Sequence, residues 1–218
     1  MSSWPRGWFD PDCTRCRRLA RHLRDVREAR PGYYARPVPP VGPADASLVI
    51  VGLAPGMHGA NRTGRPFTGD YAGLLLYRTL HELGLSNTAE SVSADDGLRL
   101  FGVRITNAVK CLPPANRPTG DEVRQCNRYL AAELADSGPS AILALGRIAH
   151  DAVLKAFGLR LKDWPFGHGA VHRPRGRPVV VDSYHCSRYN TQTGRLTDAM
   201  FREAVKTAAG YAGLTNER

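Results

Sequence analysis

The sequence predicts an α/β protein, a three-layer α/β/α sandwich around a central, mainly parallel sheet of four strands. Two observations predict this fold. Strand-like segments, three of them short apolar runs and one of them alternating, recur four times along the chain, each followed by a loop, and segments with helical spacing lie between them. Strands of a parallel sheet that is covered on both faces read as continuous apolar runs. We expect residues 1–218 to form a single domain, because this length suits one core.

The expected elements of the first half are two helices and two strands, at residues 14–29, 48–51, 74–83 and 101–108. The first helix carries apolar residues at three- and four-residue spacing among arginines. The first strand is a run of four apolar residues that ends at Gly52, and the second strand alternates apolar and polar residues. Gly84 is a suitable stop for the helix between them. Residues 31–46 are rich in proline and glycine, which indicates a linker or wrapping loop.

The second half continues the alternation, with a helix from Thr119, a strand at 141–145, a helix at 147–157, a strand at 179–181 and a helix at 196–209. Thr119 is followed three residues later by Glu122, the pattern of a capping box. Ligands of such folds bind beyond the carboxyl ends of the parallel strands. We therefore expect the site in the loops after residues 53, 108, 146 and 182.

The charge of the chain points to a polyanionic partner. Thirty Lys and Arg face twenty Asp and Glu, which gives a net charge of +10, and only four of the cations are lysines. A GC-rich genome explains much of the arginine excess, but it does not explain the net charge. No apolar run approaches the length of a membrane span, and no secretory signal is apparent. We expect a cytoplasmic protein with no membrane association.

Four of the five cysteines are candidate metal ligands. Cys13 and Cys16 form a Cys-x-x-Cys pair, and Cys111 and Cys126 flank a proline-rich loop and the start of a helix. Four thiolates can bind zinc or an iron–sulfur cluster, and the spacing does not decide between the two. The alternatives are unrelated core cysteines or disulfides, which are improbable in a chain that is not exported.

A glycine-rich loop follows the first strand, at residues 52–73. Such a loop brings backbone N–H groups close to a ligand, but this one lacks the motifs of phosphate-binding loops. It carries His58, Asn61, Phe67 and Asp70 instead. An aromatic face and polar groups suit an uncharged polar ring better than a triphosphate.

The loop after the last strand carries a second group of candidate residues. His185 lies near the carboxyl end of that strand, where it can donate a hydrogen bond or act in acid–base chemistry. Arg188 and Tyr189 follow at the tip of the loop. Large side chains in that place can contact a DNA backbone or fill a gap in a base stack.

Three motifs together resemble the uracil-DNA glycosylase superfamily, most closely its family 5, an iron–sulfur branch. They are Gly52-Leu-Ala-Pro-Gly56 running to Thr68-Gly69-Asp70, then Thr106-Asn107 running to Cys111-Leu-Pro-Pro, and Tyr184-His185-x-Ser187-x-x-Asn190. The resemblance extends from about Cys13 to the last helix. The joint occurrence of the three motifs is highly specific.

The resemblance implies a role for each catalytic candidate. Phe67 would stack on a base that has left the helix, and Asn107 would read the edge of that base. His185 would hydrogen-bond to the base oxygen that gains charge as the glycosidic bond breaks. Asp70 would favour the cationic sugar or help a water molecule to attack it.

The resemblance also implies binding roles around these residues. Gly52, Ala54 and Gly56 would shape the pocket floor, and His58 and Asn190 would complete the substrate site. Arg188 and Tyr189 would contact DNA. The family ligates a 4Fe–4S cluster, and the residues of this chain that match its ligands are Cys13, Cys16, Cys111 and Cys126. The cluster would tie residues 1–46 to the core.

The implied function is that of a DNA repair glycosylase acting as a monomer on double- or single-stranded DNA. It would flip a deaminated base, uracil and also hypoxanthine or related lesions, and hydrolyse the N-glycosidic bond. No lysine lies on the first or last motif loop, so we expect an abasic site without strand cleavage. The alternative is a non-catalytic, metal-stapled module that recognises uracil-containing DNA.

Each candidate residue also has a purely structural interpretation. Asp70 could cap a helix that starts near Tyr71, Phe67 could belong to the core, and Asn107 could hold a turn. His58 and Asn61 could order the long loop without contacting substrate. The sequence departs from many relatives outside family 5 at Leu53 and Ala54, where they carry a polar catalytic residue. It also has Cys186 where a proline is usual.

Overall fold

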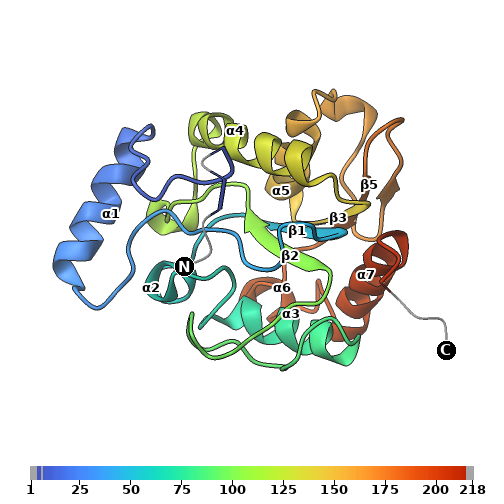
Figure 1. The fold of residues 1–218 in the computed structure, drawn as a ribbon, viewed down its shortest axis with the longest axis horizontal. Coiled ribbons are helices and arrows are strands. Elements are labelled where there is room, and N and C mark those ends of the chain that lie inside the picture. Colours follow the sequence, from blue (N-terminus) through green and yellow to red (C-terminus); the bar gives the residue numbers. More distant parts are fainter. Residues whose placement is uncertain (1–3, 6, 215–218) are drawn as a thin grey trace.

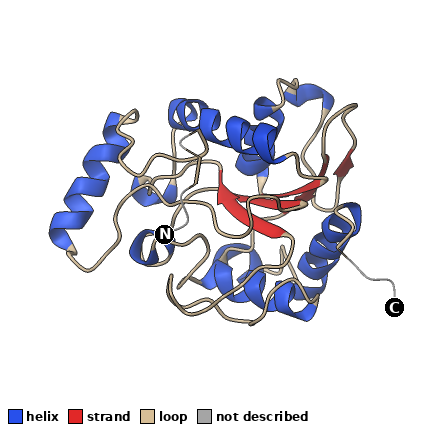
Figure 2. Cartoon of the chain, viewed as in Figure 1, coloured by secondary structure: helices blue, strands red, loops and turns tan. Residues whose placement is uncertain are grey.

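The computed structural model describes residues 4, 5 and 7–214 and confirms the three-layer α/β/α arrangement (Figures 1 and 2). The ends of the expected domain, residues 1–3 and 215–218, and residue 6 lie outside the described residues. Five strands form one sheet in the order β2-β1-β3-β5-β4. The bounds are β1 Leu48–Gly52, β2 Val103–Asn107, β3 Ala141–Leu145, β4 Val171–His172 and β5 Val179–Ser183.

The four expected strands are mutually parallel where they pair, and the fifth, β4, is antiparallel to β5. The sequence predicts four strands, and the fifth escapes prediction because β4 has only two residues. So short a segment shows no periodicity.

Seven α-helices surround the sheet in the described part of the chain. They are α1 Arg17–Ala29, α2 Ala60–Thr63, α3 Tyr71–Glu82, α4 Gly120–Ser137, α5 Arg147–Ala156, α6 Arg188–Gln192 and α7 Asp198–Tyr211. Helices α4 and α5 cover one face of the sheet, and α3 and α7 cover the other (Figure 1). None of the described helices combines the length and apolar character that a bilayer crossing requires.

The alternation of side chains along β1 builds the two apolar cores. Leu48 and Ile50 point to the α3–α7 side, and Val49 and Val51 point to the α4–α5 side. All four are fully buried. The continuous apolar run in the sequence is therefore the signature of a strand that is covered on both faces.

Side-chain caps fix where two central helices begin. Thr119 and Glu122 form the expected capping box of α4. Helix α3 begins at Tyr71, three residues before the expected start, because the Asp70 carboxylate accepts a hydrogen bond from Gly73 N at 3.0 Å. The prediction that Asp70 caps a helix starting near Tyr71 is therefore confirmed.

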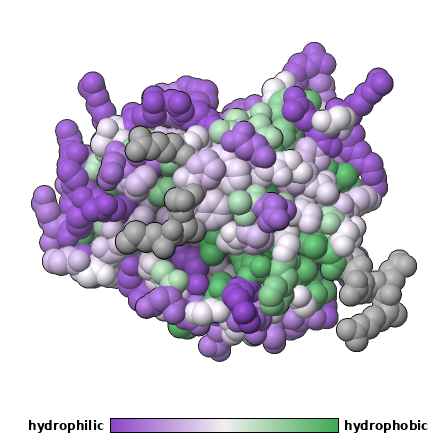
Figure 3. All heavy atoms as spheres, viewed as in Figure 1, coloured by the Kyte–Doolittle hydropathy of each residue, from purple (hydrophilic) through white to green (hydrophobic). Residues whose placement is uncertain are grey.

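Helix α1 lies at the side of the sandwich, and its surroundings are hydrophilic (Figures 1 and 3). Its buried residues are Leu19, Leu23 and Val26, which join the core on the α4–α5 side. The arginines of α1 are exposed. This part of the net positive charge is therefore a solvated face, available to an anionic partner.

A short helix replaces part of the loop expected at 182–194. Residues Arg188–Gln192 form α6, and the Ser187 hydroxyl accepts a hydrogen bond from Asn190 N at 3.4 Å. The expectation that Arg188 and Tyr189 lie on a loop tip is wrong in this respect, because they open a helix. A helix of five residues is too short for a periodic pattern to reveal it.

A buried ion network joins β2 to α4. Glu133 is completely buried and accepts hydrogen bonds from Arg104 Nε at 2.9 Å and Thr106 Oγ1 at 2.9 Å. Arg104 binds Glu133 Oε1, whereas Thr106 binds Oε2, and Lys110 Nζ lies 3.1 Å from this second oxygen. Two buried cations therefore depend on one buried carboxylate.

We predict that Glu133→Gln lowers the free energy of unfolding by about 3–5 kcal/mol, because Arg104 and Lys110 would stay buried without a counter-charge. Chemical denaturation measures the change. Glu203→Gln is the matched control, since Glu203 is exposed on α7, and it should change stability by less than about 0.5 kcal/mol. Equal stability of the two variants would contradict the prediction.

Candidate active site

A cavity of about 370 Å³ opens at the carboxyl edge of the sheet, where the sequence predicts the site. Phe67, Asp70, Asn107 and His185 all line it, although they come from three separate segments: the loop after β1, the end of β2 and the loop after β5. The full lining consists of Leu53, Ala54, Gly56, Ala60, Phe67, Asp70, Ala72, Asn107, Asn116, His185 and Ser187. The fold thus brings together the four residues singled out for chemistry.

The convergence of Phe67 and Asn107 depends on a close approach at Gly52, the last residue of β1. Gly52 pairs in register with Asn107 of β2. A Cβ at position 52 would lie 2.5 Å from Asn107 Oδ1 and 2.5 Å from Phe67 Cζ. Only glycine leaves room for both side chains, so Gly52 acts through its missing side chain.

Asn107 presents an unmet acceptor beside the cavity. The residue is 3 % exposed, and its Oδ1 is buried without a hydrogen-bond partner among the described residues. An unsatisfied buried polar atom costs about 1–3 kcal/mol. That cost indicates an oxygen kept free for a ligand, and it argues against a residue that merely holds a turn.

Phe67 and His185 form one wall of the cavity. Their ring centroids lie 5.9 Å apart with an interplanar angle of 27°. Phe67 is buried, joins the core on the α3–α7 side, and has a left-handed backbone with φ of 54°. The core and cavity interpretations of Phe67 therefore hold together. A strained backbone at such a place is typical of a functional site.

His185 is a neutral imidazole at physiological pH. Burial lowers its pKa to about 4, because the apolar surroundings disfavour the charged ring. A neutral ring can still donate one hydrogen bond. His185 is therefore suited to stabilise an anion that develops during a reaction, without carrying a positive charge beforehand.

Asp70 has two roles in the geometry. Its Oδ1 caps α3, while the carboxylate also lines the cavity. Burial raises the pKa of Asp70, although the N–H groups of Gly73 and Ala72 oppose the rise. The other oxygen lies so close to Gly59 that a Cβ there would be 2.4 Å from Oδ2. Cap and cavity residue are thus one and the same side chain.

The four cysteines expected to bind a metal centre line a second cavity, away from the first. Cys13 and Cys16 precede α1, and Cys111 and Cys126 come from the loop after β2 and from α4. Burial raises the pKa of Cys16 to about 11, and the neighbouring Cys126 adds to the rise. Four thiolates in one cavity repel one another, so the donor set fits a cationic centre. Cys186 is not part of it, because it is buried in the core on the α3–α7 side.

Comparison with known proteins agrees with this geometry. The family model of the uracil DNA glycosylase superfamily matches residues 39–209. The chain belongs to that superfamily. A type-5 uracil-DNA glycosylase of Thermus thermophilus is 50 % identical over 208 residues, 93 % of this chain and 94 % of the relative. One of Pyrobaculum aerophilum is 46 % identical and covers 96 % of both chains.

A type-4 uracil-DNA glycosylase of Archaeoglobus fulgidus is 38 % identical over 165 residues, 74 % of this chain and 73 % of the relative. The identity to the two type-5 proteins is higher and extends over more of the chain. This confirms the resemblance to family 5 within the uracil-DNA glycosylase superfamily.

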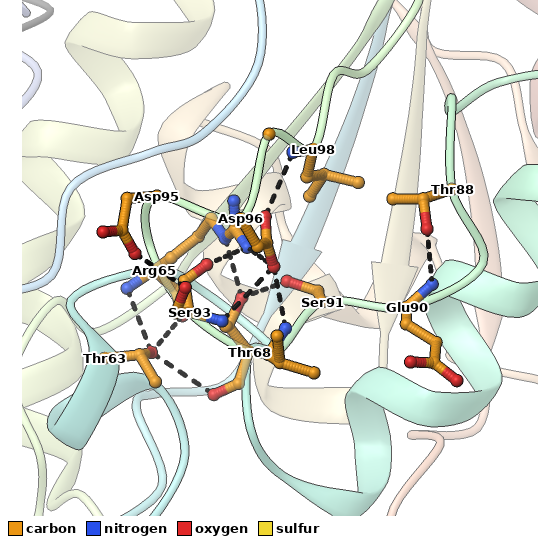
Figure 4. A network of polar contacts seen from close by, with 12 residues as sticks. Thr63, Arg65, Thr68, Thr88, Glu90, Ser91, Ser93, Asp95, Asp96 and Leu98 are labelled. Carbon is orange, nitrogen blue, oxygen red and sulfur yellow. Dashed lines mark hydrogen bonds and ion pairs between the residues drawn. The ribbon is translucent and has the colours of Figure 1, made fainter.

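In this superfamily member, Arg65 clamps the loop that carries Phe67 (Figure 4). Its guanidinium donates to Thr68 Oγ1 at 3.0 Å and also to Ser93 O and to the Asp96 carboxylate. Arg65 is 6 % exposed. The clamp therefore ties the loop of the first motif to residues 91–98 in a place that water screens poorly.

A second clamp holds the strand that leads to His185. His150 Nδ1 lies 2.8 Å from Asp182 Oδ1, and His172 Nε2 lies 2.9 Å from Asp182 Oδ2. Burial alone would lower the pKa of His150, but the Asp182 carboxylate raises it above its ordinary value. All three side chains are buried. Asp182 therefore links α5 and β4 to the end of β5.

The remaining candidates divide into those at the cavity and those outside it. Ala54 and Gly56 line it. His58 does not: it is exposed, and its Nδ1 lies 2.9 Å from Tyr33 Oη. Asn190 acts indirectly, because its Nδ2 donates to His185 O at 2.8 Å. Asn61 is buried and does not line the cavity; its backbone N–H donates to Gly56 O at 3.1 Å, and its side-chain amide has no hydrogen-bond partner among the described residues.

Sequence reasoning missed several cavity residues. Leu53, Ala60 and Ala72 are apolar, and Asn116 is exposed at the mouth. Nothing in the residue type singles out Ala60 or Ala72, whereas Leu53 stands out only as a position where many relatives outside family 5 carry a polar catalytic residue. Ser187 was within reach, because it belongs to the third motif.

We predict that the His185 imidazole titrates at about 4 in the folded protein, because burial disfavours the charged ring. NMR of labelled histidine measures the titration, and His185→Gln identifies the resonance. In the urea-unfolded chain the same ring should return to its ordinary value of 6.5. A titration near that value in the folded protein would contradict the assignment of a neutral donor.

Proposed function

We propose that this protein is a uracil-DNA glycosylase, which binds a uracil nucleotide extruded from DNA and hydrolyses its N-glycosidic bond. The observation that carries the proposal is the convergence of Phe67, Asn107, His185 and Asp70 on one cavity. Membership of the superfamily supports it, as do the type-5 relatives that are named for this activity.

The cavity matches uracil group by group. The apolar face of Phe67 suits a flat base, and the Asn107 amide offers an acceptor and donors to the edge with N3–H and O4. The bond to be broken lies inside the stack of a duplex, so the nucleotide must leave the helix first. The net charge of +10 helps to bind the phosphates and offsets part of that cost.

Bond breaking moves charge in two directions. As the C1′–N1 bond breaks, its electron pair goes to the base and the sugar becomes cationic. The neutral His185 donates a hydrogen bond to the base oxygen that gains charge, and the Asp70 carboxylate stabilises the sugar. A water molecule then bonds to C1′ and gives up its proton, for which Asp70 is the acceptor.

The positions of the lysines support cleavage of the N-glycosidic bond without cleavage of the DNA strand. Strand cleavage through a Schiff base needs an amine at the sugar. None of the described cavity-lining residues is a lysine, and Lys110 is buried against Thr106 and Glu133. The product is therefore an abasic site. We extend the proposal to hypoxanthine as a further substrate on the resemblance to family 5.

The cofactor proposal is a 4Fe–4S cluster held by Cys13, Cys16, Cys111 and Cys126. All four line one cavity. In a single tetrahedral zinc site with bonds of about 2.3 Å the sulfurs lie about 3.8 Å apart. Among the described residues, no three cysteine sulfurs lie within 4.8 Å of one another, so their spacing is wider than a single zinc ion with thiolate ligands requires.

The cluster's role would be structural. When bound, it supplies four covalent links that tie residues 1–46 to the loop after β2 and to α4. Hydrolysis of a glycosidic bond changes no oxidation state, so the reaction itself does not require electron transfer.

We predict that the purified protein releases free uracil from a uracil-containing oligonucleotide and that Asp70→Asn lowers the rate about a hundredfold or more. Asn keeps the cap of α3. It also removes a buried carboxylate whose raised pKa means that its charged form destabilises the fold once the pH exceeds that pKa. Asp70→Asn should therefore unfold at no lower denaturant concentration than wild type at pH 7.

Asp70→Ala is the companion variant. It loses the cap as well and should be about 1 kcal/mol less stable than Asp70→Asn, with a similar loss of rate. Binding of uracil-containing DNA without release by the wild type would overturn the enzyme proposal and leave the binding module. Full activity of Asp70→Asn would show that Asp70 is only a cap.

We predict that protein purified anaerobically is brown, absorbs broadly in the visible range and contains about four irons and four sulfides per chain. Cys126→Ser should lose the iron and expose α1 to proteolysis. Cys186→Ala is the matched control and should keep it, because Cys186 lies outside the cysteine cavity. A colourless protein with one bound zinc would refute the cluster.

A further inference from the structure

Large apolar side chains are exposed beside the mouth of the active-site cavity. Tyr71 is 36 %, Leu74 62 % and Tyr189 71 % exposed. Tyr71 and Leu74 lie three residues apart in the first turn of α3, so they share a face of that helix. Neither residue lines the cavity, and neither is used in the proposed chemistry.

Contacts join this face of α3 to α6. The Arg188 guanidinium lies over the Tyr71 ring, 5.1 Å from its centroid. Thr191 Oγ1 lies 3.2 Å from Tyr71 Oη. Tyr71, Leu74, Arg188 and Tyr189 therefore belong to two helix starts that are held together, and we call these four residues the rim.

The rim is continuous with the cavity. Asp70 and Ala72, on either side of Tyr71 in the chain, both line the cavity, and so does Ser187, which precedes Arg188. When a nucleotide of a DNA strand enters the cavity, the nucleotides next to it in the strand must therefore lie close to the rim.

The chemistry of the rim selects among possible partners. The rim offers two aromatic rings and one aliphatic side chain but only one cation, the Arg188 guanidinium, so most of its surface does not suit phosphate. Such groups match the apolar faces of bases that have lost a stacking neighbour, bordered by phosphates. Duplex DNA acquires these bare faces when a nucleotide leaves the helix.

We infer that Tyr71 and Leu74, together with Arg188 and Tyr189 at the start of α6, form one surface that packs against the bases left unstacked in duplex DNA. The inference rests on the proposed function and adds two residues to the DNA interface. It also makes the rim specific to duplex substrates, because a single strand has no ordered stack to hold open.

The test compares wild type with Tyr71→Ala/Leu74→Ala under single-turnover conditions. The substrates are a uracil-containing duplex and the same uracil strand alone. Loss of base contacts should slow release from the duplex about tenfold or more, while release from the single strand stays within about twofold. Phe101→Ala is the matched control, because Phe101 is 47 % exposed before β2 and outside the rim. It should leave both rates unchanged.

A second readout does not depend on turnover. In an Asp70→Asn background, 2-aminopurine next to the uracil reports unstacking by its fluorescence. The rise in fluorescence on binding duplex should shrink when Tyr71 and Leu74 are both alanine. An unchanged rise would overturn the inference.

The other outcomes are distinct. Equal slowing on both substrates would mean that the variant damages the catalytic site, and no slowing on either would mean that the rim contacts nothing. Both overturn the inference. A wild-type dimer that the double variant converts to a monomer, with unchanged duplex rates, would assign the rim to a second copy of the chain. Failure of the wild type to release uracil from either substrate would instead refute the proposed function.

Discussion

The close approach of three chain segments at Gly52 is the constraint on which the site depends. Gly52, at the end of β1, has no side chain. Asn107 from β2 and Phe67 from the loop after β1 therefore both reach the position that a Cβ would occupy. Gly59 gives the same freedom to Asp70. A parallel sheet brings the ends of its strands to one edge, but the missing side chains decide how closely the groups at that edge meet.

Buried polar contacts outside the cavity hold the loops that carry its polar side chains. Arg65 and Asp182 each hold one of the loops that line the cavity through contacts to segments from elsewhere in the fold. This frame leaves Asn107 Oδ1 without a hydrogen-bond partner among the described residues, and it buries His185, which lowers the pKa of the imidazole. Stability is thus spent on keeping groups ready for a ligand, which is the usual arrangement of preorganised sites.

Much of the fold follows from local patterns. The apolar run Leu48–Val51 predicts β1, and the Thr119–Glu122 pair predicts the start of α4, because both signals lie within a few residues. The same reasoning fails for β4 and α6, which are too short to carry a period. It also misses the Arg65–Asp96 and His150–Asp182 contacts, since each joins residues about thirty positions apart. The motifs located Asp70, Asn107 and His185, but the exposure of His58 depends on how the long loop folds back on Tyr33.

The most direct test of the proposed geometry is a crystal structure with an intact uracil nucleotide in duplex DNA. A fluorine at C2′ of the sugar disfavours the cationic transition state and so preserves the bond. We expect the uracil to lie out of the helix and stacked on Phe67, with its N3–O4 edge on the Asn107 amide, its O2 beside His185 and its C1′ beside the Asp70 carboxylate. A uracil that remains stacked in the duplex, or lies outside this cavity, would contradict the account.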